Sequence, residues 1–328
     1  MMKLTTGSYG GERDLEAIAE MLQECEKSDR LDEWVGLSDV RERFETPLSN
    51  GIRDARLWFD DNNQLQAVAQ LSVPELGKAM DGALWFRSRP TARNQGIEGE
   101  IIEWGERRMK ELGAAKNNSS LKLFSEARDR QTERKVLLES SGFTICRYFY
   151  RMERSLLEPF GEPQLPPEFK LRSALAPEFG GARSRQLTRA WVEMFNQTFI
   201  DHWNHHQLTV EELESELNNP NYRPDLDFIA VAADGTFAAF CYCFIHQENN
   251  HRTGCREGFI AALGTRRGFR RQGLGRAMLL VGMQHLKAAG MKKALLGVDA
   301  ENPSGAMELY RSVGFRPVRT LIHYMKQL

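Results

Sequence analysis

The sequence predicts a mixed α/β fold that is built twice, and three observations support this prediction. Apolar runs with the period of strands alternate with amphipathic stretches that have the period of helices. A segment at 156–167 holds four prolines and a glycine, so it can form neither a helix nor a central strand. The same order of elements and the same turn motifs occur before and after that segment. With 328 residues, the chain has the length of two average domains.

The hydrophobic periodicity assigns the elements in chain order. In the first half, helices are expected at 14–23, 32–44, 95–112 and 130–140, and strands at 57–59, 66–73, 82–86, 121–124 and 144–152. In the second half, helices are expected at 185–199, 209–217, 304–313 and from Leu274 to a stop at Gly290, and strands at 228–232, 237–244, 259–263, 293–298 and 320–326. We therefore predict domains at 1–155 and 169–328, joined by a proline-rich linker at 156–168.

Composition and charge argue against several classes of protein. The 44 Lys and Arg residues are balanced by 45 Asp and Glu residues, whereas domains that bind nucleic acids are usually strongly basic. No apolar stretch has the length of a membrane span, and no apolar segment of a secretion signal follows the N-terminus. The five cysteines lack zinc-type spacing, which favours reduced thiols in a cytoplasmic protein. We expect neither a nucleic-acid nor a membrane partner, and the oligomeric state stays open.

The stretch 263–280 carries the strongest functional signal. A strand leads into the turn Arg270-Arg271-Gln272-Gly273-Leu274-Gly275, where a helix begins. Its glycines let a ligand approach the backbone closely, and the first N–H groups of a helix attract anions. Five arginines add positive potential, at 266, 267, 270, 271 and 276. The pattern predicts a phosphate site, and the alternative is an ordinary strand-to-helix turn with solvated arginines.

Motifs further along the chain make a family resemblance plain. Arg270-x-x-Gly273-x-Gly275 is followed by Asn302, Leu309-Tyr310 and Gly314-Phe315, an order that resembles the GNAT superfamily of acyl-CoA-dependent N-acyltransferases. The resemblance implies two tandem GNAT domains, each with a mixed, mostly antiparallel sheet, a splayed strand pair and flanking helices. It implies acetyl-CoA as the default co-substrate, without a metal. The residues implied to bind it are Leu263, Thr265, Arg270, Arg271, Gln272, Gly273, Leu274, Gly275, Arg276 and Asn302.

The resemblance also implies roles in catalysis. Tyr310 would be the general acid that protonates the departing thiolate, and its alternative role is to pack as a half-buried helical tyrosine. Asn302 would bind the pantetheine arm or cap the following helix. Glu257 is the nearest carboxylate on the strand before the turn, and alternation places it on the same face as Ala261. We expect Glu257 to be either the general base or a solvated residue at the strand end.

A candidate acceptor site follows the first helix of the second half. The segment Phe199-Ile-Asp201-His202-Trp203 resembles tandem GNAT proteins of the mycothiol synthase type. This implies aromatic walls from Phe199 and Trp203, with His202 beside them and Asp201 attracting an ammonium group. The alternative is an aromatic core in which the aspartate caps a helix. Three histidines, His202, His205 and His206, lack a fourth ligand nearby, so we expect no metal.

The first half carries weakened versions of the same motifs. Glu98 stands where Gly275 stands in the second half, and Leu138 stands where Tyr310 stands. A carboxylate at this turn repels phosphates, and leucine has no proton to donate. We predict that the first domain is catalytically silent. It would then serve as a scaffold, line part of the acceptor site, or bind CoA weakly.

Together these features predict an acyl-CoA-dependent N-acyltransferase that acts by direct transfer in its C-terminal domain. The expected acceptor is a primary amine of a small metabolite. The alternatives are a peptide or protein N-acetyltransferase and a non-catalytic acyl-CoA-binding module.

Overall fold

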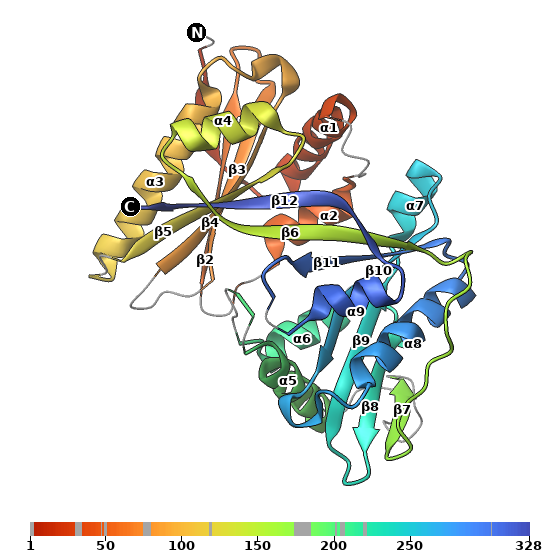
Figure 1. Cartoon of the computed structure of the whole chain (residues 1–328). Coiled ribbons are helices and arrows are strands. Elements are labelled where there is room, and N and C mark those ends of the chain that lie inside the picture. Colours follow the sequence, from red (N-terminus) through yellow and green to blue (C-terminus); the bar gives the residue numbers. More distant parts are fainter. Residues whose placement is uncertain are drawn as a thin grey trace. The chain divides into compact units, whose positions relative to one another are not determined.

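The structure is a computed structural model that describes residues 3–29, 35–46, 48, 51–74, 80–117, 120–173, 185–200, 202–203, 207–218, 222–302 and 304–328. The chain divides into two compact units. Unit 1 comprises Met1–Tyr148 and Leu321–Leu328, and unit 2 comprises Phe149–Thr320. Two strands, β6 (Thr144–Ser155) and β12 (Arg316–Gln327), have residues in both units (Figure 1).

Unit 1 is built on a mixed sheet with the strand order β1-β2-β3-β4-β5-β12. Its elements are β1 (Thr5–Ser8), α1 (Glu12–Asp29), α2 (Leu37–Glu45), β2 (Ile52–Phe59), β3 (Leu65–Val73), β4 (Met80–Ser88), a 3-10 turn (Pro90–Ala92), α3 (Ile97–Ala115), β5 (Leu121–Arg128) and α4 (Thr132–Ser140). Strands β4 and β5 are parallel, and their pairing ends at Ala83 and Phe124. The neighbouring pairs of β1 to β4, and the pair of β5 with β12, are antiparallel.

Unit 2 repeats this arrangement with the strand order β6-β11-β10-β9-β8-β7. Its further elements are β7 (Phe169–Ser173), α5 (Arg185–Phe199), α6 (Val210–Leu217), a 3-10 turn (Pro224–Leu226), β8 (Asp227–Ala232), β9 (Phe237–Phe244), α7 (Gln247–Thr253), β10 (Glu257–Thr265), a 3-10 turn (Arg267–Phe269), α8 (Leu274–Ala288), β11 (Lys293–Asp299) and α9 (Ala306–Ser312). Here β10 and β11 are the parallel pair, and their pairing ends at Ile260 and Leu296. The predicted mixed α/β fold with a splayed strand pair is confirmed.

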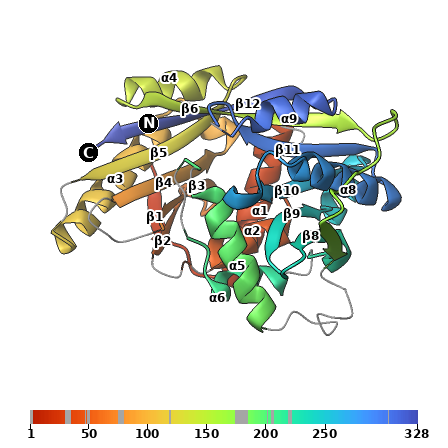
Figure 2. The ribbon, with the colours of Figure 1, turned by 60° about the horizontal axis from the view of Figure 1, so that its bottom comes forward.

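Helices cover both faces of each sheet and bury two apolar cores per unit. In unit 1, Ile101 of α3 and Leu138 of α4 belong to one core, whereas Ile18 of α1 and Val40 of α2 belong to another. In unit 2, Met278 of α8 and Tyr310 of α9 share a core. A separate core on the other face joins α5 and α6 to β9 (Figure 2). These layers follow from the amphipathic periods of the helices and the alternation of the strands.

The backbone confirms that the two halves repeat the same design. The turn after β4 has Asn94 at φ 59° and Gly96 at φ 95°, and the turn after β10 has Arg271 at φ 65° and Gly273 at φ 85°. The helix that follows each turn begins at the next residue, Ile97 or Leu274. Since the backbone of the two turns is alike, the predicted functional difference between the halves rests on side chains.

The periodicity was less informative at the edges of the sheets. Strands β1 and β7 and helix α7 were not predicted, because short edge elements carry little apolar pattern. The described residues also divide at Tyr148 and again at Thr320, whereas the proline-rich segment lies inside unit 2. No described helix combines the length and the apolar character that crossing a membrane requires. The cytoplasmic location stays a prediction.

Candidate functional site

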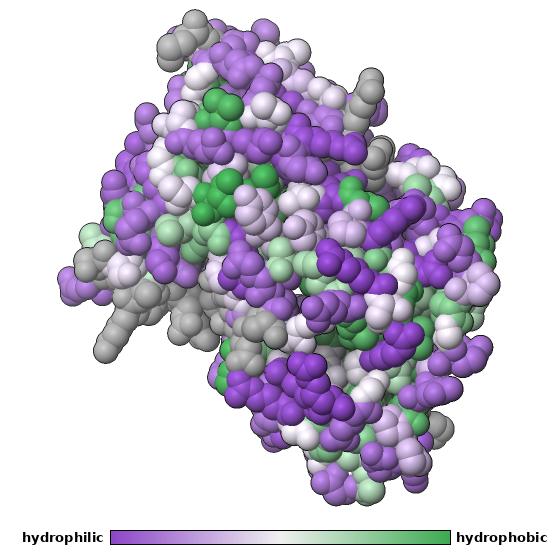
Figure 3. All heavy atoms as spheres, viewed as in Figure 1, coloured by the Kyte–Doolittle hydropathy of each residue, from purple (hydrophilic) through white to green (hydrophobic). Residues whose placement is uncertain are grey.

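The splayed strands of unit 2 open a cavity of about 980 Å³. Strands β10 and β11 separate after Ile260, where β10 also has an irregular register with β9 between Ile260 and Ala262. The space-filling view shows hydrophilic residues around a hollow beside α9 (Figure 3). The lining residues are Phe149, Thr198, Phe199, His202, Ile260–Thr265, Phe269, Arg270, Arg271, Gly273–Arg276, Gly297–Asp299, Asn302, Ser304–Ala306, Glu308–Tyr310 and Ser312.

The predicted phosphate turn forms one wall of this cavity. Helix α8 begins at Leu274, after Gly273 in the left-handed conformation, so the N–H groups of its first turn have no partner within the helix. A Cβ added to Gly275 would lie 3.4 Å from Leu309 Cδ2 and 3.6 Å from Thr265 Oγ1, which are ordinary contacts. The fold therefore does not require a glycine at 275, and the open space there suits the close approach of a ligand.

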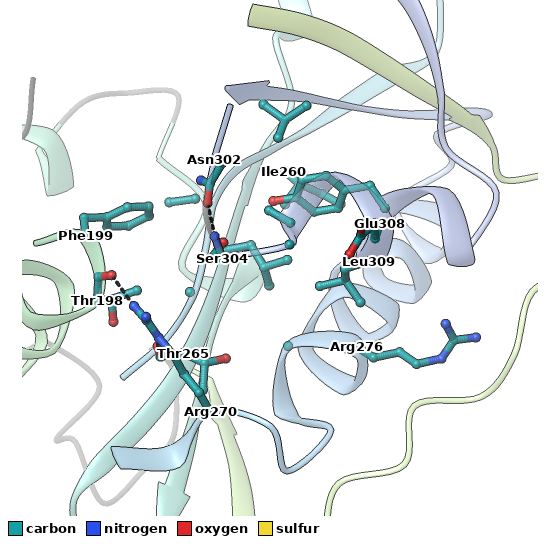
Figure 4. A pocket seen from close by; sticks show the side chains of 18 of the residues that line it. Thr198, Phe199, Ile260, Thr265, Arg270, Arg276, Asn302, Ser304, Glu308 and Leu309 are labelled. Atoms are coloured by element: carbon teal, nitrogen blue, oxygen red, sulfur yellow. Dashed lines mark hydrogen bonds between the residues drawn. The ribbon is translucent and has the colours of Figure 1, made fainter. Parts of the chain in front are cut away.

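The arginines of the turn are held by neighbouring elements. Arg270 donates to the carbonyl oxygens of Thr265 and Thr198, at 3.1 and 2.9 Å, and so links β10 to the end of α5 (Figure 4). Arg276 donates to Ser312 Oγ at 2.7 Å and so links α8 to α9. Both guanidinium groups line the cavity, whereas Gln272 does not. These contacts fix positive charge at the wall where phosphates are expected.

Tyr310 lines the cavity while its ring is packed in the core. The residue is 8% exposed, and its ring lies 6.1 Å from the ring of Phe315. Burial, with a smaller effect of Cys241, raises the pKa of Tyr310 to about 12. The phenol is therefore protonated near neutral pH, as a proton donor must be.

Asn302 and two carboxylates, Asp299 and Glu308, also line the cavity. Asn302 Oδ1 accepts the N–H of Ser304 at 2.8 Å and shapes the loop before α9 (Figure 4). Asp299 ends β11, is 2% exposed and accepts the N–H of Glu301 at 3.0 Å. Both Asp299 and the exposed Glu308 line the cavity, and the sequence analysis singled out neither.

Glu257 lies elsewhere on β10. It is the first residue of that strand, and the lining begins three residues later, at Ile260. Its Oε1 is 3.7 Å from Lys293 Nζ, on the neighbouring strand. The structure thus does not bring Glu257 together with Tyr310 in the cavity lining. Alternation predicted its face of the strand, but not its position along the strand.

The predicted acceptor residues are partly brought together. Phe199 and His202 line the cavity. Trp203 does not, but its ring lies 5.9 Å from that of Phe149, which does. Asp201, His205 and His206 lie outside the described residues. Within the described ranges, no group of three His, Cys, Asp or Glu side chains is arranged to hold a metal.

Thr198 and Gly264 line the cavity but were not predicted from the sequence. A Cβ on Gly264 would lie 2.3 Å from Thr198 Cγ2 and 2.7 Å from the Phe240 ring, so only glycine lets α5 pack this closely on β10. Thr198 Oγ1 is buried and has no hydrogen-bond partner among the described residues. The available signal was a glycine inside a strand, which often marks a close backbone approach.

Comparison with known proteins agrees with this geometry. Residues 188–315 match the sequence model of the acetyltransferase (GNAT) family. Residues 188–315 are a GNAT acetyltransferase domain. The match covers the turn, Asn302 and Tyr310, and it confirms the predicted family and enzyme class for this part of the chain.

The chain is also similar to other proteins of known sequence and structure. It is 32% identical over 174 residues to a mycothiol acetyltransferase of Thermobispora bispora, covering 53% of this chain and 55% of that protein. A mycothiol acetyltransferase of Thermobifida fusca is 28% identical over 288 residues, covering 85% and 86%. The structure of a tandem GNAT protein from the clavulanic acid biosynthesis pathway superimposes with a TM-score of 0.75 at 12% identity, covering 99% and 98%. The tandem GNAT fold is thereby confirmed.

Proposed function

We propose that unit 2 transfers an acyl group, acetyl by default, from the CoA thioester to a primary amine of a small molecule. The observation that supports this most directly is that Tyr310 and the turn at 270–276 line the same cavity. A turn with free N–H groups and fixed arginines suits the pyrophosphate of CoA. A buried, protonated phenol suits the departing sulfur.

Direct transfer needs few protein groups, because the thioester is already activated. The amine nitrogen attacks the thioester carbonyl carbon, the C–S bond breaks, and the thiolate takes a proton from Tyr310. The nitrogen loses a proton to a carboxylate, so protons balance over the reaction. The unpartnered Oγ1 of Thr198 is a donor that the bound acyl-CoA can use. The remaining contribution is to hold the amine next to the carbonyl.

We propose Asp299 as the proton acceptor in preference to Glu257. Asp299 lines the cavity and is nearly buried, whereas Glu257 is paired with Lys293 outside the lining. Substitution Asp299→Asn should lower kcat, with the largest decrease at the low-pH end of the assay range. The affinity for acetyl-CoA should stay unchanged. Glu257→Gln serves as the matched control. A larger loss of kcat in the Glu257→Gln control would instead support Glu257 as the general base.

The acceptor is proposed to be a small amine that contacts an aromatic wall. Phe149, Phe199 and His202 line the cavity, and Trp203 supports Phe149. Several relatives are named mycothiol acetyltransferases, which favours a small-molecule amine over a peptide. The similarity spans only 55% of the length of the Thermobispora protein, so the substrate of this chain is a proposal.

Unit 1 is proposed to be silent toward acyl-CoA. Glu98 Oε1 accepts a hydrogen bond from Ser88 Oγ at 2.7 Å beside the first turn of α3. The Arg134 side chain lies where β4 and β5 have separated, donating to the carbonyl oxygens of Glu126 at 2.6 Å and Phe86 at 3.4 Å. A guanidinium that bridges both strands leaves less room for a pantetheine arm. Leu138 supplies no proton.

Calorimetric titration with acetyl-CoA, followed by a screen of amines, tests the proposal. One site per chain, with turnover that depends on Tyr310, is expected. Two sites would contradict the silence of unit 1. Binding without turnover of any small amine or peptide would favour a non-catalytic acyl-CoA-binding module, and turnover of peptides alone would favour a peptide acetyltransferase.

A further inference from the structure

Three guanidinium groups meet at β4 of unit 1. Arg43 of α2 and Arg87 of β4 both lie against the Trp85 ring, with Cζ 4.4 and 5.3 Å from its centroid. Arg87 and Arg134 of α4 both donate from Nη1 to the carbonyl oxygen of Phe86, at 3.0 and 3.4 Å. Arg87 therefore has a like charge on each side.

In the described part of unit 1, no carboxylate pairs directly with this cluster. None of the three arginines forms an ion pair with a described carboxylate, whereas other described arginines of the unit do, among them Arg13, Arg41, Arg89, Arg93 and Arg108. Glu126 contributes a negative charge near both Arg134 and Arg43, Glu98 one near Arg134, and Glu42 one near Arg43. Glu126 Oε2 also lies 3.9 Å from His323 Nε2. Burial, followed by the charge of Arg87, lowers the pKa of Arg134 to about 9, and the same two causes lower the pKa of Arg43.

The cluster is built to bind an anion. Arg134 is fixed by its donation to the Glu126 carbonyl oxygen at 2.6 Å and by the Phe86 ring 3.9 Å from its Cζ. The Arg43 guanidinium donates no hydrogen bond to a described residue, and Arg87 uses one of its N–H groups. Two planar forks thus keep free donors, and paired guanidinium forks match the several oxygens and double charge of a phosphate group.

We propose that Arg43, Arg87 and Arg134 form a binding site in unit 1 for a phosphate group, either free or carried by a small molecule. All of its residues belong to unit 1, and none belongs to the CoA turn of unit 2. The site would remove the mutual repulsion of the three cations. It is a second ligand site beyond the proposed acyltransferase centre.

Titration calorimetry of the full chain, run with and without saturating CoA, tests the site, because CoA fills the turn at 270–276 and the titration without CoA shows whether CoA competes for the three arginines. Inorganic phosphate and glycerol phosphate are the probes, and acetate represents carboxylates. Arg43→Gln is the first variant, since the Arg43 guanidinium donates no hydrogen bond to a described residue and its removal should spare the fold. Arg87→Gln is the second. Arg107→Gln, an exposed arginine of α3 in the same unit, is the matched control.

We expect one phosphate site in the wild type, with affinity reduced about tenfold or more in each test variant and unchanged in the control. Binding of glycerol phosphate alone would assign the site to a phosphate ester, and binding of both would assign it to the phosphate group itself. No binding of either probe, equal losses in the control, or tighter binding of acetate would overturn the proposal. A separate titration with CoA alone shows whether CoA binds. The acyl-CoA proposal for unit 2 and the phosphate proposal for unit 1 can therefore fail independently.

Discussion

Glu98 accepts a hydrogen bond from Ser88 Oγ at 2.7 Å in unit 1, and the corresponding residues of unit 2, Gly275 and Thr265, leave that space open. The two turns have the same backbone conformation. A carboxylate in unit 1 therefore occupies the space that Gly275 leaves open in unit 2.

Substitution Gly275→Glu should abolish CoA binding while the fold stays intact. The first Cβ makes only ordinary contacts, and the added carboxylate repels the pyrophosphate. Calorimetric titration measures the affinity, and thermal unfolding checks the fold. Gly275→Ala is the matched control and should retain binding. Unchanged affinity in the glutamate variant would refute the phosphate assignment.

Substitution Tyr310→Phe should lower kcat about a hundredfold or more and leave the affinity for acetyl-CoA nearly unchanged. The phenylalanine keeps the packing against Phe315 but removes the proton donor. Steady-state kinetics with the best amine from the screen measures the effect. If kcat stayed within twofold of the wild type, another group would have to protonate the sulfur.

The raised pKa of Tyr310 predicts a loss of stability at alkaline pH. Its pKa rises from 10.0 to about 12 in the folded state, so the unfolded chain releases this proton first. The stability is fully present below pH 10 and is lost as the pH rises toward 12. At pH 11 the loss should be about 1 kcal/mol relative to pH 8. Chemical unfolding of wild type and Tyr310→Phe isolates this effect from other tyrosines, and parallel curves would contradict it.

Arg271 occupies a left-handed backbone conformation that arginine rarely adopts. Substitution Arg271→Asn copies Asn94 of the other turn and should raise the free energy of unfolding by about 0.5–1 kcal/mol. Urea unfolding without CoA measures the change. Arg271→Ala should give no such gain, because alanine shares the strain. An equal gain in both variants would point to charge instead.

The local chemistry of this chain was predictable, whereas its long-range arrangement was not. The turn, the helix after it and Tyr310 lie in one continuous stretch of sequence. The motifs of that stretch can be recognised without the structure. Glu257 was placed on the correct strand, but its distance from the cavity depends on where β10 and β11 separate. Asp299 ends β11, three residues beyond Leu296, where the pairing with β10 stops. The arginine cluster could not be predicted from a motif, because its members, Arg43, Arg87 and Arg134, are far apart in the sequence.

Strand β6 begins in unit 1 and ends in unit 2, and strand β12 begins in unit 2 and ends in unit 1. This arrangement has a consequence for biosynthesis. Gln327 donates to the carbonyl oxygen of Leu121, 206 residues earlier in the chain. During translation, β5 must therefore wait for almost the whole of unit 2 before its partner strand leaves the ribosome. A nascent chain that stopped after Ser155 would expose β5 as an unpaired edge. We expect such a fragment to need a chaperone or to aggregate, even though it includes most residues of unit 1.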